Sequence, residues 1–503
     1  MNLATLLART ARLSPDAPAL GDGTTLVSYR ELDDRVSRLA DGLLRTGLEF
    51  GDRVAILMAN RPEVIESLYA CFRAGLVAVP INSRLHPDEV RYIVSHAGAR
   101  AIVAGPEHGA SARDSGASFV IGTGRDYEGL ISDGDPGFVE RDVTIGSPAW
   151  LFYTSGTTGR PKGATLSHGN LVEMVMACLA NVTDYRPSDI VLHAAPLTHG
   201  AGLYALAGIT RGAFHLVPPS PPFDPLVVLD TVARVRVTVL SFLTPTMVRL
   251  LLDAAVAGAP DIRSLRAIVY GGGPMYAEDL RRAQATFGLI LTQIYGLGET
   301  PMTVTYLPPF IPAEEGQQLA SVGTAHPNIE LRLLDEAGAE APVGAMGEVC
   351  VRSGVVMLGY WNDAEATAEV LKGGWLHTGD LGRLDESGYL YLLDRKKDLI
   401  VSGGSNIYPR EVEEVLIAYP GVTAVAVIGV PDRHWGESVH AVVVPDPGVT
   451  LTAAELIAFC LTQIASYKKP RTVEFVTELP VSGHGKVLKR DLREQWQRAR
   501  SQG

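Results

Sequence analysis

The sequence predicts an α/β fold, with a large N-terminal domain of parallel sheets covered by helices and a small α+β C-terminal domain. Of the 503 residues, 46% are hydrophobic and 20% charged, which is enough for several packed cores and too balanced for disorder. Apolar runs of strand length alternate with helical stretches over most of the chain, a pattern typical of parallel sheets. After Val349 the strands shorten and the turns become rich in glycine, which indicates a second domain.

The first helix and strands can be placed from local signals. Ser28 and Glu31 form a capping-box pattern, which predicts that a helix begins there. Apolar residues then recur at the i, i+4, i+7 and i+11 positions of an amphipathic helix. These residues are Leu32, Val36, Leu39 and Leu43. A strand at 54–58, a helix from Pro62 and a strand at 77–80 follow, so the predicted order is strand, helix, strand.

The same alternation continues beyond residue 163. Short apolar runs separated by helical stretches predict further parallel strands. The predicted strands lie at 190–194, 213–217, 237–241, 266–270 and 289–293.

The polar segment 394–398 is the predicted joint between the domains, because it follows the strand pattern at 388–393 and precedes a new set of elements. A helix opens at Pro409, where proline suits the first turn, and 424–428 reads as a strand. The predicted domains are therefore residues 1–395 and 398–503, the second being of ordinary domain size.

Composition excludes several classes of protein. With 44 basic and 56 acidic residues the net charge is −12, which argues against nucleic acid or an anionic membrane as the main partner. The four cysteines are far apart, so structural disulfides and zinc are not expected. We find no targeting segment and no integral membrane segment, and a reducing cytoplasm is the expected compartment. A homodimer is left open.

The most informative segment is residues 153–163, Tyr-Thr-Ser-Gly-Thr-Thr-Gly-Arg-Pro-Lys-Gly, directly after an apolar run at 149–152. Glycines let backbone N–H groups face an anion, hydroxyls add donors, and Lys162 adds a point charge. The spacing does not fit a Walker A loop. The alternative, a flexible linker, rarely follows a buried strand. The segment predicts a polyphosphate clamp that includes Thr154, Ser155, Gly156, Thr157, Thr158 and Lys162.

This segment resembles the phosphate loop of the AMP-forming adenylating enzymes, a superfamily that includes acyl-CoA synthetases, aryl-CoA ligases, peptide-synthetase adenylation domains and beetle luciferases. Further blocks of the family pattern recur in order between Gly271 and Lys486, and the chain is most similar to the aryl- and fatty-acyl-CoA ligases. The resemblance implies ATP, Mg²⁺ and coenzyme A as ligands and a mobile C-terminal domain with its hinge at Lys397.

Two blocks are similar to the family's nucleotide pocket. The first is Gly271-Gly272-Gly273-Pro274 after a strand, where missing side chains let the backbone approach a flat ligand; alone, it could be a simple turn. The second is Tyr295-Gly296-Leu297-Gly298-Glu299-Thr300. By resemblance Tyr295 packs on adenine and Glu299 holds Mg²⁺, which suits a carboxylate. The family's threonine is replaced by Gly298, so Thr300, a backbone N–H or water must supply the missing donor.

The remaining blocks resemble the ribose and catalytic positions. Asp380 of a Thr-Gly-Asp turn and Arg395 match the two ribose contacts, and a carboxylate suits a diol because it only accepts hydrogen bonds. Lys486 matches the terminal lysine that bridges the α-phosphate and the attacking carboxylate. Positive charge that acts more strongly in the transition state is what this reaction requires.

The acid would lie beside His199, which matches the family's histidine block, although a lone histidine is often a core residue. The matching blocks place mostly small or uncharged residues around it and no arginine for a second carboxylate. We therefore expect an aromatic or medium-chain monocarboxylic acid. The predicted pocket comprises His199, Gly202, Tyr204, Gly273, Gly298, Met302 and Thr303.

Three segments of the C-terminal domain resemble the family's coenzyme A site. Glycines suit a narrow tunnel, an aromatic face suits adenine, and lysines suit phosphates. The predicted residues are Gly403, Gly404, Trp435, Tyr467 and Lys469. Core packing of Trp435 and a solvated charge pair at 468–469 remain alternatives, and Ser405 stands where many relatives carry glutamate.

Three functions are consistent with the sequence. The first is an AMP-forming acid–CoA ligase that works through an acyl-adenylate. The second keeps adenylate formation with another acceptor or acid, as in carrier-protein loading, amide formation or nitrite activation. The third is a nucleotide-binding regulatory or scaffold protein without turnover, which the joint presence of the cationic and acidic site residues argues against.

Overall fold

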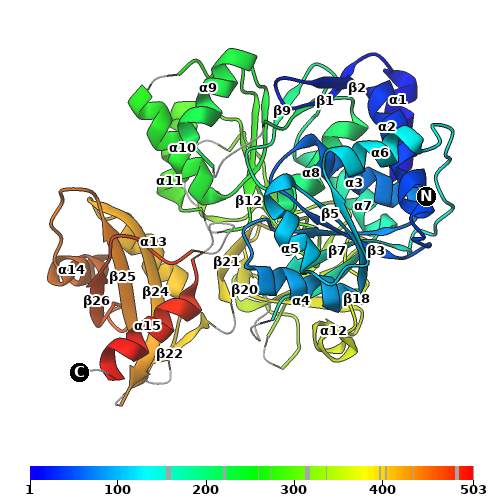
Figure 1. Cartoon of the computed structure of the whole chain (residues 1–503). Helices are drawn as coiled ribbons and strands as arrows, with labels where there is room; N and C mark the ends of the chain where they lie inside the picture. The colour runs from blue at the N-terminus through cyan, green and yellow to red at the C-terminus, as the bar shows by residue number, and fades with distance from the viewer. Residues whose placement is uncertain are drawn as a thin grey trace.

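The computed structural model describes residues 1–154, 160–218, 223–258, 260–273, 275–311, 318–335, 337–395, 398–402, 405–433, 435–481 and 487–501. Its described part has two large sheets with helices between and outside them, a smaller antiparallel sheet, and a C-terminal α+β domain (Figure 1). The predicted α/β fold class is therefore confirmed.

The described residues of the first large sheet form seven strands in the order β18-β8-β7-β4-β3-β5-β6. The pairs from β7 to β6 are parallel, whereas β8 pairs antiparallel with both β7 and β18. The sheet therefore turns antiparallel at the edge that carries the phosphate segment. Its strands are β3 (Arg53–Leu57), β4 (Val77–Ile81), β5 (Ala99–Ala104), β6 (Phe119–Gly122), β7 (Pro148–Thr154), β8 (Lys162–Ser167) and β18 (Gly359–Tyr360).

The second large sheet has nine strands among the described residues, in the order β15-β14-β13-β12-β11-β9-β10-β1-β2. Its centre is parallel and its two edges are antiparallel. The strands are β1 (Pro18–Gly21), β2 (Leu26–Ser28), β9 (Ile190–Leu192), β10 (Phe214–Leu216), β11 (Val239–Leu243), β12 (Ala267–Gly271), β13 (Leu291–Tyr295), β14 (Thr305–Leu307) and β15 (Thr324–Ala325).

The main core lies between these two sheets, where α3 and α8 are buried along almost their whole lengths. A helical layer covers each outer face: α4 and α5 on the first sheet, and α9, α10 and α11 on the second. The helices of the N-terminal part are α1 (Ala4–Leu13), α2 (Tyr29–Arg45), α3 (Pro62–Ala74), α4 (Pro87–Ala97), α5 (Gly109–Arg113), α6 (Arg125–Asp133), α7 (His168–Asn181), α8 (Gly200–Thr210), α9 (Pro225–Val235), α10 (Pro245–Gly258), α11 (Ala277–Phe287) and α12 (Ala364–Val370), with short 3-10 helices at Pro106–His108 and Gln318–Ala320.

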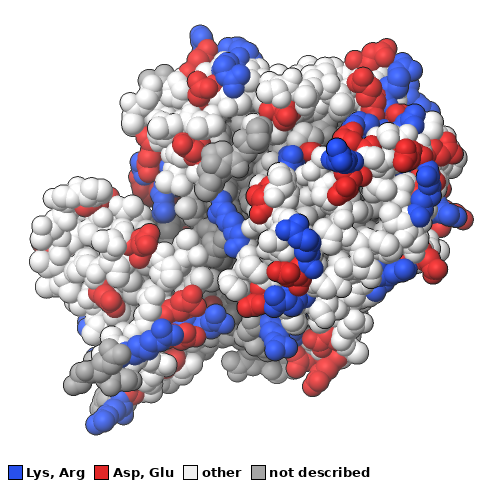
Figure 2. Space-filling model, in the orientation of Figure 1, with Lys and Arg blue, Asp and Glu red and all other residues white. Residues whose placement is uncertain are grey.

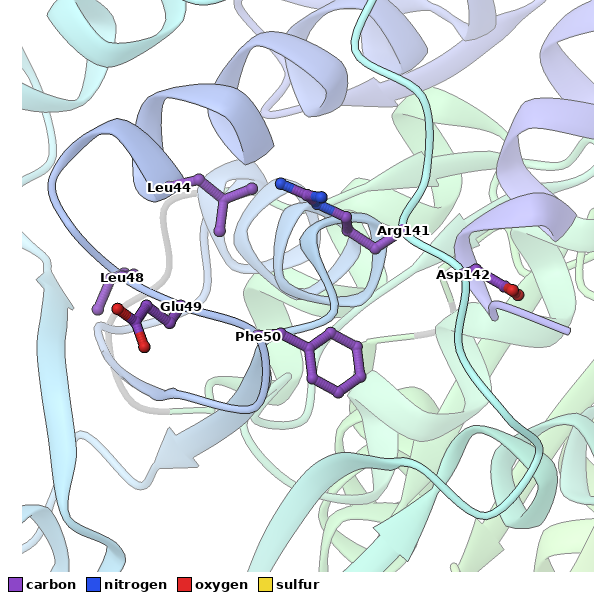
Figure 3. A pocket seen from close by; sticks show the side chains of 6 residues that line it. All are labelled: Leu44, Leu48, Glu49, Phe50, Arg141 and Asp142. Carbon is purple, nitrogen blue, oxygen red and sulfur yellow. The ribbon is translucent and has the colours of Figure 1, made fainter.

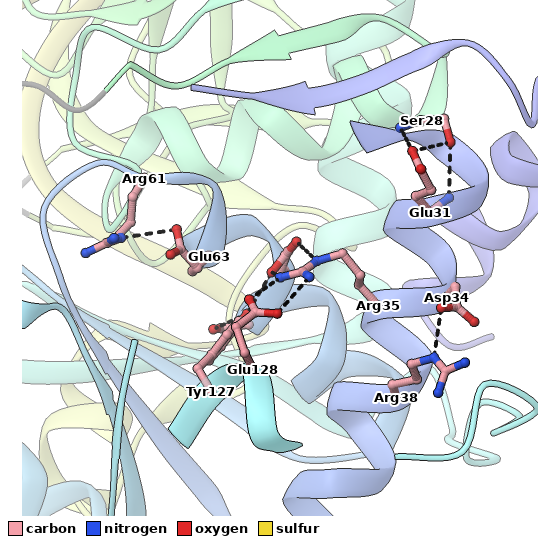
Figure 4. A network of polar contacts seen from close by, with 11 residues as sticks. Ser28, Glu31, Asp34, Arg35, Arg38, Arg61, Glu63, Tyr127 and Glu128 are labelled. Carbon is pink, nitrogen blue, oxygen red and sulfur yellow. Dashed lines mark hydrogen bonds and ion pairs between the residues drawn. The ribbon is translucent and has the colours of Figure 1, made fainter. Parts of the chain in front are cut away.

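A charged network joins three of these helices (Figure 4). Arg35 of α2 donates to Glu66 of α3 at 2.6 Å and to Glu128 of α6 at 2.8 Å, and Tyr127 donates to Glu66 at 3.1 Å. Because Glu66 is almost fully buried, its charge requires these partners. The network therefore fixes how the first helices pack. Ser28 also forms the predicted capping box with Glu31.

The third sheet is antiparallel and leads to the C-terminal domain. Its described strands are β16 (Glu330–Leu334), β17 (Met346–Arg352), β19 (Leu371–Lys372), β20 (Trp375–Leu384) and β21 (Leu390–Arg395). The C-terminal domain contains β22 (Ile400–Ser402), β23 (Ser405–Ile407), α13 (Pro409–Ile417), β24 (Val422–Asp432), β25 (Gly436–Pro445), α14 (Ala453–Gln463), β26 (Thr472–Phe475) and α15 (Lys489–Ser501).

Several strand boundaries differ from the sequence prediction. The strand predicted at 424–428 extends over the whole of β24, because its antiparallel partner β25 pairs with it from Val422 to Asp432. The five strands predicted between 190 and 293 all exist, but β11 and β13 each begin and end two residues later. Such shifts arise because pairing within the sheet, rather than the apolar run alone, sets the ends of a strand.

The described part of the chain has no helix that is long and apolar enough to cross a bilayer. The four cysteines, Cys71, Cys178, Cys350 and Cys460, are buried free thiols.

Several histidines are buried as neutral rings. Burial lowers the pKa of His326 to about 4 and that of His193 to about 3. An unfolded chain protonates histidine near pH 6.5. Between these values the unfolded state binds more protons than the folded state, so stability must fall as the pH falls.

We expect the urea midpoint of unfolding to decrease between about pH 6.5 and pH 5, and His326→Gln to reduce that decrease. Glutamine can accept the 3.3 Å hydrogen bond from Asn181 but does not titrate. The substitution removes a contribution of about 1.4 kcal/mol per pH unit to the free energy of unfolding. Urea unfolding of both proteins across this range checks it, with the exposed His86 changed to Gln as the control. Identical slopes for wild type and His326→Gln would contradict the assignment.

Candidate functional site

The phosphate segment joins two antiparallel strands. β7 ends at Thr154 and β8 begins at Lys162, and these two residues are paired across the strands. Ser155, Gly156, Thr157 and Thr158 lie outside the described residues. The expected buried strand before the segment is β7, whose residues 149–152 are buried. A strand follows the segment, whereas a helix follows a Walker A loop.

Lys162 lies beside an acidic and an aromatic side chain. Its Nζ atom is 3.6 Å from Asp363 Oδ2 and 5.3 Å from the ring centre of Tyr360. The lysine side chain is 23% exposed, so its ammonium group is accessible to a ligand. A polyphosphate would compete with Asp363 for this ammonium group.

Glu299 is linked to the same tyrosine. The Tyr360 hydroxyl donates to Glu299 Oε1 at 2.6 Å, and Glu299 is only 8% exposed. Tyr360 therefore contacts both the predicted phosphate lysine and the predicted metal ligand. No group of three or more His, Cys, Asp and Glu among the described residues could hold a metal ion. A Mg²⁺ at Glu299 would thus take most of its ligands from phosphate oxygens and water, which is its usual preference.

Gly298, which replaces the family's threonine, has no room for a side chain. A Cβ atom there would lie 2.6 Å from the ring of Phe152 and 2.6 Å from the methyl group of Thr154. Both contacts come from β7, so the loop after β13 packs directly on the strand that carries the phosphate segment. The side chain of Thr154 occupies the space that a threonine at 298 would need.

The side chain of Thr300 forms a hydrogen bond within its own turn. Its hydroxyl accepts from the backbone N–H of Leu297 at 3.0 Å, and the residue is fully buried. This geometry does not favour Thr300 as the replacement phosphate ligand, although that role remains a prediction. Gly296 allows the turn to close, since a Cβ there would lie 2.4 Å from the backbone of Met302 and Thr303.

The predicted adenine and ribose residues meet. The Tyr295 hydroxyl donates to Asp380 Oδ2 at 2.8 Å, and both residues are 8% exposed. Across β20 and β21, Asp380 is the direct partner of Arg395. The Tyr295 side chain and the backbones of Asp380 and Arg395, the two predicted ribose-binding residues, therefore lie close together. The Arg395 side chain and the predicted hinge Lys397 lie outside the described part.

The glycine triplet ends β12 as predicted. Gly272 has a φ of +82°, a conformation that favours glycine, and a Cβ on Gly271 would lie 2.5 Å from the carbonyl oxygen of Ile294. A Cβ on Gly273 would make only an ordinary van der Waals contact with Pro245. Pro274 falls outside the described residues.

The predicted acid pocket contains an aromatic cluster, defined as Phe152, His199, Tyr204 and Phe242. The His199 ring lies 4.8 Å from Phe152 and 6.4 Å from Phe242, and Tyr204 lies 5.8 Å from Phe242. In the family the aromatic residue precedes the histidine in sequence. In this chain the aromatic neighbours of His199 come from β7 and β11 instead.

The other predicted pocket residues divide into two groups. Tyr204 donates to the carbonyl oxygen of Met302 at 3.3 Å, which places Met302 and the adjacent Thr303 beside the cluster. Gly202 has no room for a side chain, because its Cβ would lie 2.0 Å from the Leu197 carbonyl oxygen and 3.3 Å from Trp150. This close approach explains why the residue is glycine.

In the C-terminal domain, Trp435 is 38% exposed and Tyr467 is 53% exposed, so core packing of Trp435 is not supported. The guanidinium of Arg471 stacks over Trp435 at 4.8 Å, which joins the turn before β25 to the segment that contains Lys469. Lys468 pairs with Glu411 at 2.6 Å, whereas the alternative reading expected a solvated charge pair at 468–469. Gly403 and Gly404 are outside the described residues.

Lys486 also lies outside the described residues, within 482–486, whereas the flanking Val481 and Val487 pair with each other.

Sequence reasoning missed Tyr360, Phe152, Phe242 and Arg471. Tyr360 is 61 residues from the carboxylate that it contacts, and no spacing rule connects the two. Arg471 could have been found, because it lies two residues after the predicted Lys469.

Lys and Arg side chains line part of the hollow between the small domain and the rest of the molecule on the face shown in Figure 2. Local positive charge of this kind is what an acidic protein needs in order to bind an anion. Two surface pockets lie elsewhere. One of about 530 Å³ is bordered by Leu44, Phe50 and Arg141 (Figure 3), and one of about 510 Å³ by Tyr92, His96 and Arg160. Neither is lined by a predicted site residue.

We expect Gly298→Thr to destabilise the protein by about 1–3 kcal/mol, because overpacking forces neighbouring groups to move. The double variant with Phe152→Ala should lose less stability than the sum of the two single losses, since the two residues share one space. Urea unfolding of the single and double variants measures the coupling.

Gly129→Ala in α6 is the matched control, because a Cβ there meets nothing within 4 Å. Strict additivity of Gly298→Thr and Phe152→Ala would show that the predicted overlap is absent.

Comparison with known proteins agrees with this arrangement. The model of the AMP-binding enzyme family matches residues 7–361, and the model of the AMP-binding enzyme C-terminal domain matches residues 411–486. Feruloyl-CoA synthase of an Amycolatopsis species is 41% identical over 96% of this chain and 97% of its own length. Indoleacetate–CoA ligase of Aromatoleum aromaticum is 36% identical, with 98% of each chain covered.

Among solved structures, ATP-bound MatB from Rhodopseudomonas palustris is 34% identical with a TM-score of 0.89, and 99% of each chain is covered. The amide bond synthetase McbA from Marinactinospora thermotolerans is 32% identical, also with a TM-score of 0.89, over 98% of this chain and 99% of its own. Both family models match in order and the similarity extends over nearly the whole length, so the chain belongs to the AMP-binding, adenylate-forming family of enzymes.

Proposed function

We propose that this enzyme is an ATP-dependent acid–CoA ligase that forms an acyl-adenylate and then a thioester. The observation that carries the proposal is the single contact chain Lys162–Tyr360–Glu299, which lies where β7 packs on the loop after β13. In this proposal, Lys162 and the proposed metal ligand Glu299 would lie together on one side of the triphosphate.

In the first half-reaction, a carboxylate oxygen of the acid attacks the α-phosphorus of ATP. The bond from that phosphorus to the bridging oxygen breaks, and pyrophosphate leaves with the electron pair. Lys162 would neutralise the departing phosphates, and Glu299 would hold Mg²⁺, which supplies further positive charge when bound. Lys486 would bring its charge to the α-phosphate and the attacking carboxylate.

The nucleoside would be held by Tyr295, Asp380 and Arg395. The hydrogen bond from Tyr295 to Asp380 fixes the carboxylate in place before a ribose arrives, which lowers the ordering cost of binding.

In the second half-reaction, the thiolate of coenzyme A attacks the acyl carbon, the C–O bond to the phosphate breaks, and AMP leaves. The thiol proton goes to solvent. The exposed Trp435, with Tyr467 and Lys469 on the neighbouring segment, would bind the nucleotide of coenzyme A after the C-terminal domain turns about Lys397.

The acid is proposed to be an aryl or medium-chain monocarboxylic acid. Phe152 and Phe242 are apolar and buried, and His199 and the hydroxyl group of the buried Tyr204 are the polar groups of the cluster. The names of two relatives, feruloyl-CoA synthase and indoleacetate–CoA ligase, refer to aromatic acids, which supports this choice. Four buried free thiols are compatible with the proposed cytoplasmic location.

An acyl carrier protein is the second candidate acceptor, because a 36% identical relative from Streptomyces coeruleorubidus is a fatty acid–[acyl-carrier-protein] ligase. A carrier-bound phosphopantetheine would use the same thiol chemistry as coenzyme A.

We expect pyrophosphate release that depends on a monocarboxylic acid, and AMP release that rises when coenzyme A is added. The Lys486→Ala variant should slow adenylate formation by orders of magnitude and leave thioester formation from supplied acyl-AMP largely intact, because its charge acts on the first transition state. Coupled assays of pyrophosphate, AMP and thioester check both statements.

The exposed Lys372 changed to Ala is the control. AMP release that ignores coenzyme A for every productive acid would favour the second acceptor class, and equal losses in both half-reactions would remove the role given to Lys486.

We expect Tyr360→Phe to raise the Mg²⁺ concentration needed for half-maximal pyrophosphate release by roughly 10–100-fold, the usual effect of losing a group that orients a metal ligand. Titrating Mg²⁺ against pyrophosphate release, and separately measuring Mg²⁺–ATP binding by calorimetry, checks this. Tyr419→Phe in the C-terminal domain is the matched control. An unchanged Mg²⁺ requirement in Tyr360→Phe is the result that would refute it.

A further inference from the structure

Phe242 interrupts β11 at the edge of the aromatic cluster. The pairing of β11 with β12 shifts register between Leu240 and Leu243, and Phe242 within this bulge has a φ of +55°. A bulge re-aims a side chain, and a bulky residue in the left-handed region is a conformational outlier that surrounding structure must impose. The backbone is therefore strained in a way that directs this ring.

The ring points into a space that two glycines leave open. A Cβ on Gly200, the first residue of α8, would lie 2.2–2.4 Å from the Phe242 ring. A Cβ on Gly272, which precedes the predicted pocket residue Gly273, would lie 3.8 Å from it. Phe242 is only 3% exposed, so the ring fills the space between the start of α8 and the loop after β12.

The same ring contacts two residues predicted to line the acid pocket. It lies edge-on to His199, with an interplanar angle of 84°, and tilted by 39° against Tyr204. The His199 ring in turn contacts Phe152, against which Gly298 packs. Phe152 of β7 and Phe242 of β11, which come from different sheets, therefore both contact the His199 ring.

We propose that Phe242 is the specificity-determining residue that limits the length of the acid, and that the bulge in β11 holds it in that position. This inference rests on the proposed function. The body of the acid would start beside His199 and end against the Phe242 ring, so the preferred acids are compact ones, such as a single aromatic ring. Longer acids require the ring to leave the space between Gly200 and Gly272.

Phe242→Ala shortens the side chain to a methyl group and extends this space. We expect the ratio of kcat/KM for long acids to that for short acids to rise by roughly tenfold or more, because each methylene accommodated in an apolar pocket changes discrimination by about 10–200-fold. The test measures pyrophosphate release by the full chain with benzoate, 4-alkylbenzoates of increasing length, and straight-chain acids. Because the active fraction of protein cancels in the ratio, a merely destabilised variant does not move it.

Two further variants keep the test decisive. Phe242→Gly removes the ring and also suits the left-handed backbone, so it serves where Phe242→Ala folds poorly. Phe214→Ala is the matched control, because it removes a half-buried ring from β10 outside the aromatic cluster; it should leave the ratio unchanged.

A double variant tests the contact itself. Gly200→Ala should reduce activity with short acids, because its methyl group overlaps the ring, and Gly200→Ala with Phe242→Ala should restore adenylation and shift preference to longer acids. Restoration supports the contact, and an unrelieved loss in the double variant overturns it.

An unchanged ratio in both Phe242 variants, with wild-type adenylation intact, overturns this inference and leaves the proposed function standing. Absence of acid-dependent pyrophosphate release from the wild type overturns the proposed function and the inference with it.

Discussion

The candidate site depends on one steric constraint, the absence of a side chain at Gly298. Because nothing projects from this residue, Phe152 and Thr154 of β7 pack directly on the loop that follows β13. That contact brings the first large sheet against the second at the point where the phosphate segment begins. Lys162 of β8 and Glu299 of the loop after β13 thereby share contact with Tyr360. In this chain a bulkier residue at 298 would overlap with Phe152 and Thr154 and disturb this contact.

The small domain docks beside the same loops. Arg410 of α13 donates to the carbonyl oxygen of Met275, and Arg249 of α10 donates to that of Thr423. Arg410 also lies beside Glu414, whose pKa is raised by burial. The contact between α13 and the N-terminal part therefore includes a carboxyl group that is partly removed from water. Met275 lies two residues after Gly273, so the docking of α13 is connected to the predicted nucleotide pocket through a few residues of backbone.

Much of the fold was predictable from local signals. The capping box at Ser28, the proline that opens α3 and the alternating apolar runs each report a local preference that tertiary packing preserved. The ends of β11 and β24 were not predictable, because pairing with β12 and β25 determines them. In the site, ordered motifs predicted Tyr295, Asp380, Lys162 and Glu299. The family's aromatic residue beside His199 could not be found by position, because β7 and β11 supply it.

By itself the sequence determined the family, the order of its motifs and the chemical type of each predicted site residue, since these depend on residues that are close together in the chain. Only the tertiary structure decided which groups meet: Tyr360 with Glu299, Arg471 with Trp435, and Phe242 with Gly200. These contacts join residues 36 to 61 positions apart, from different strands, helices and loops. Their geometry follows from how sheets pack and where a strand bulges, which no local pattern encodes.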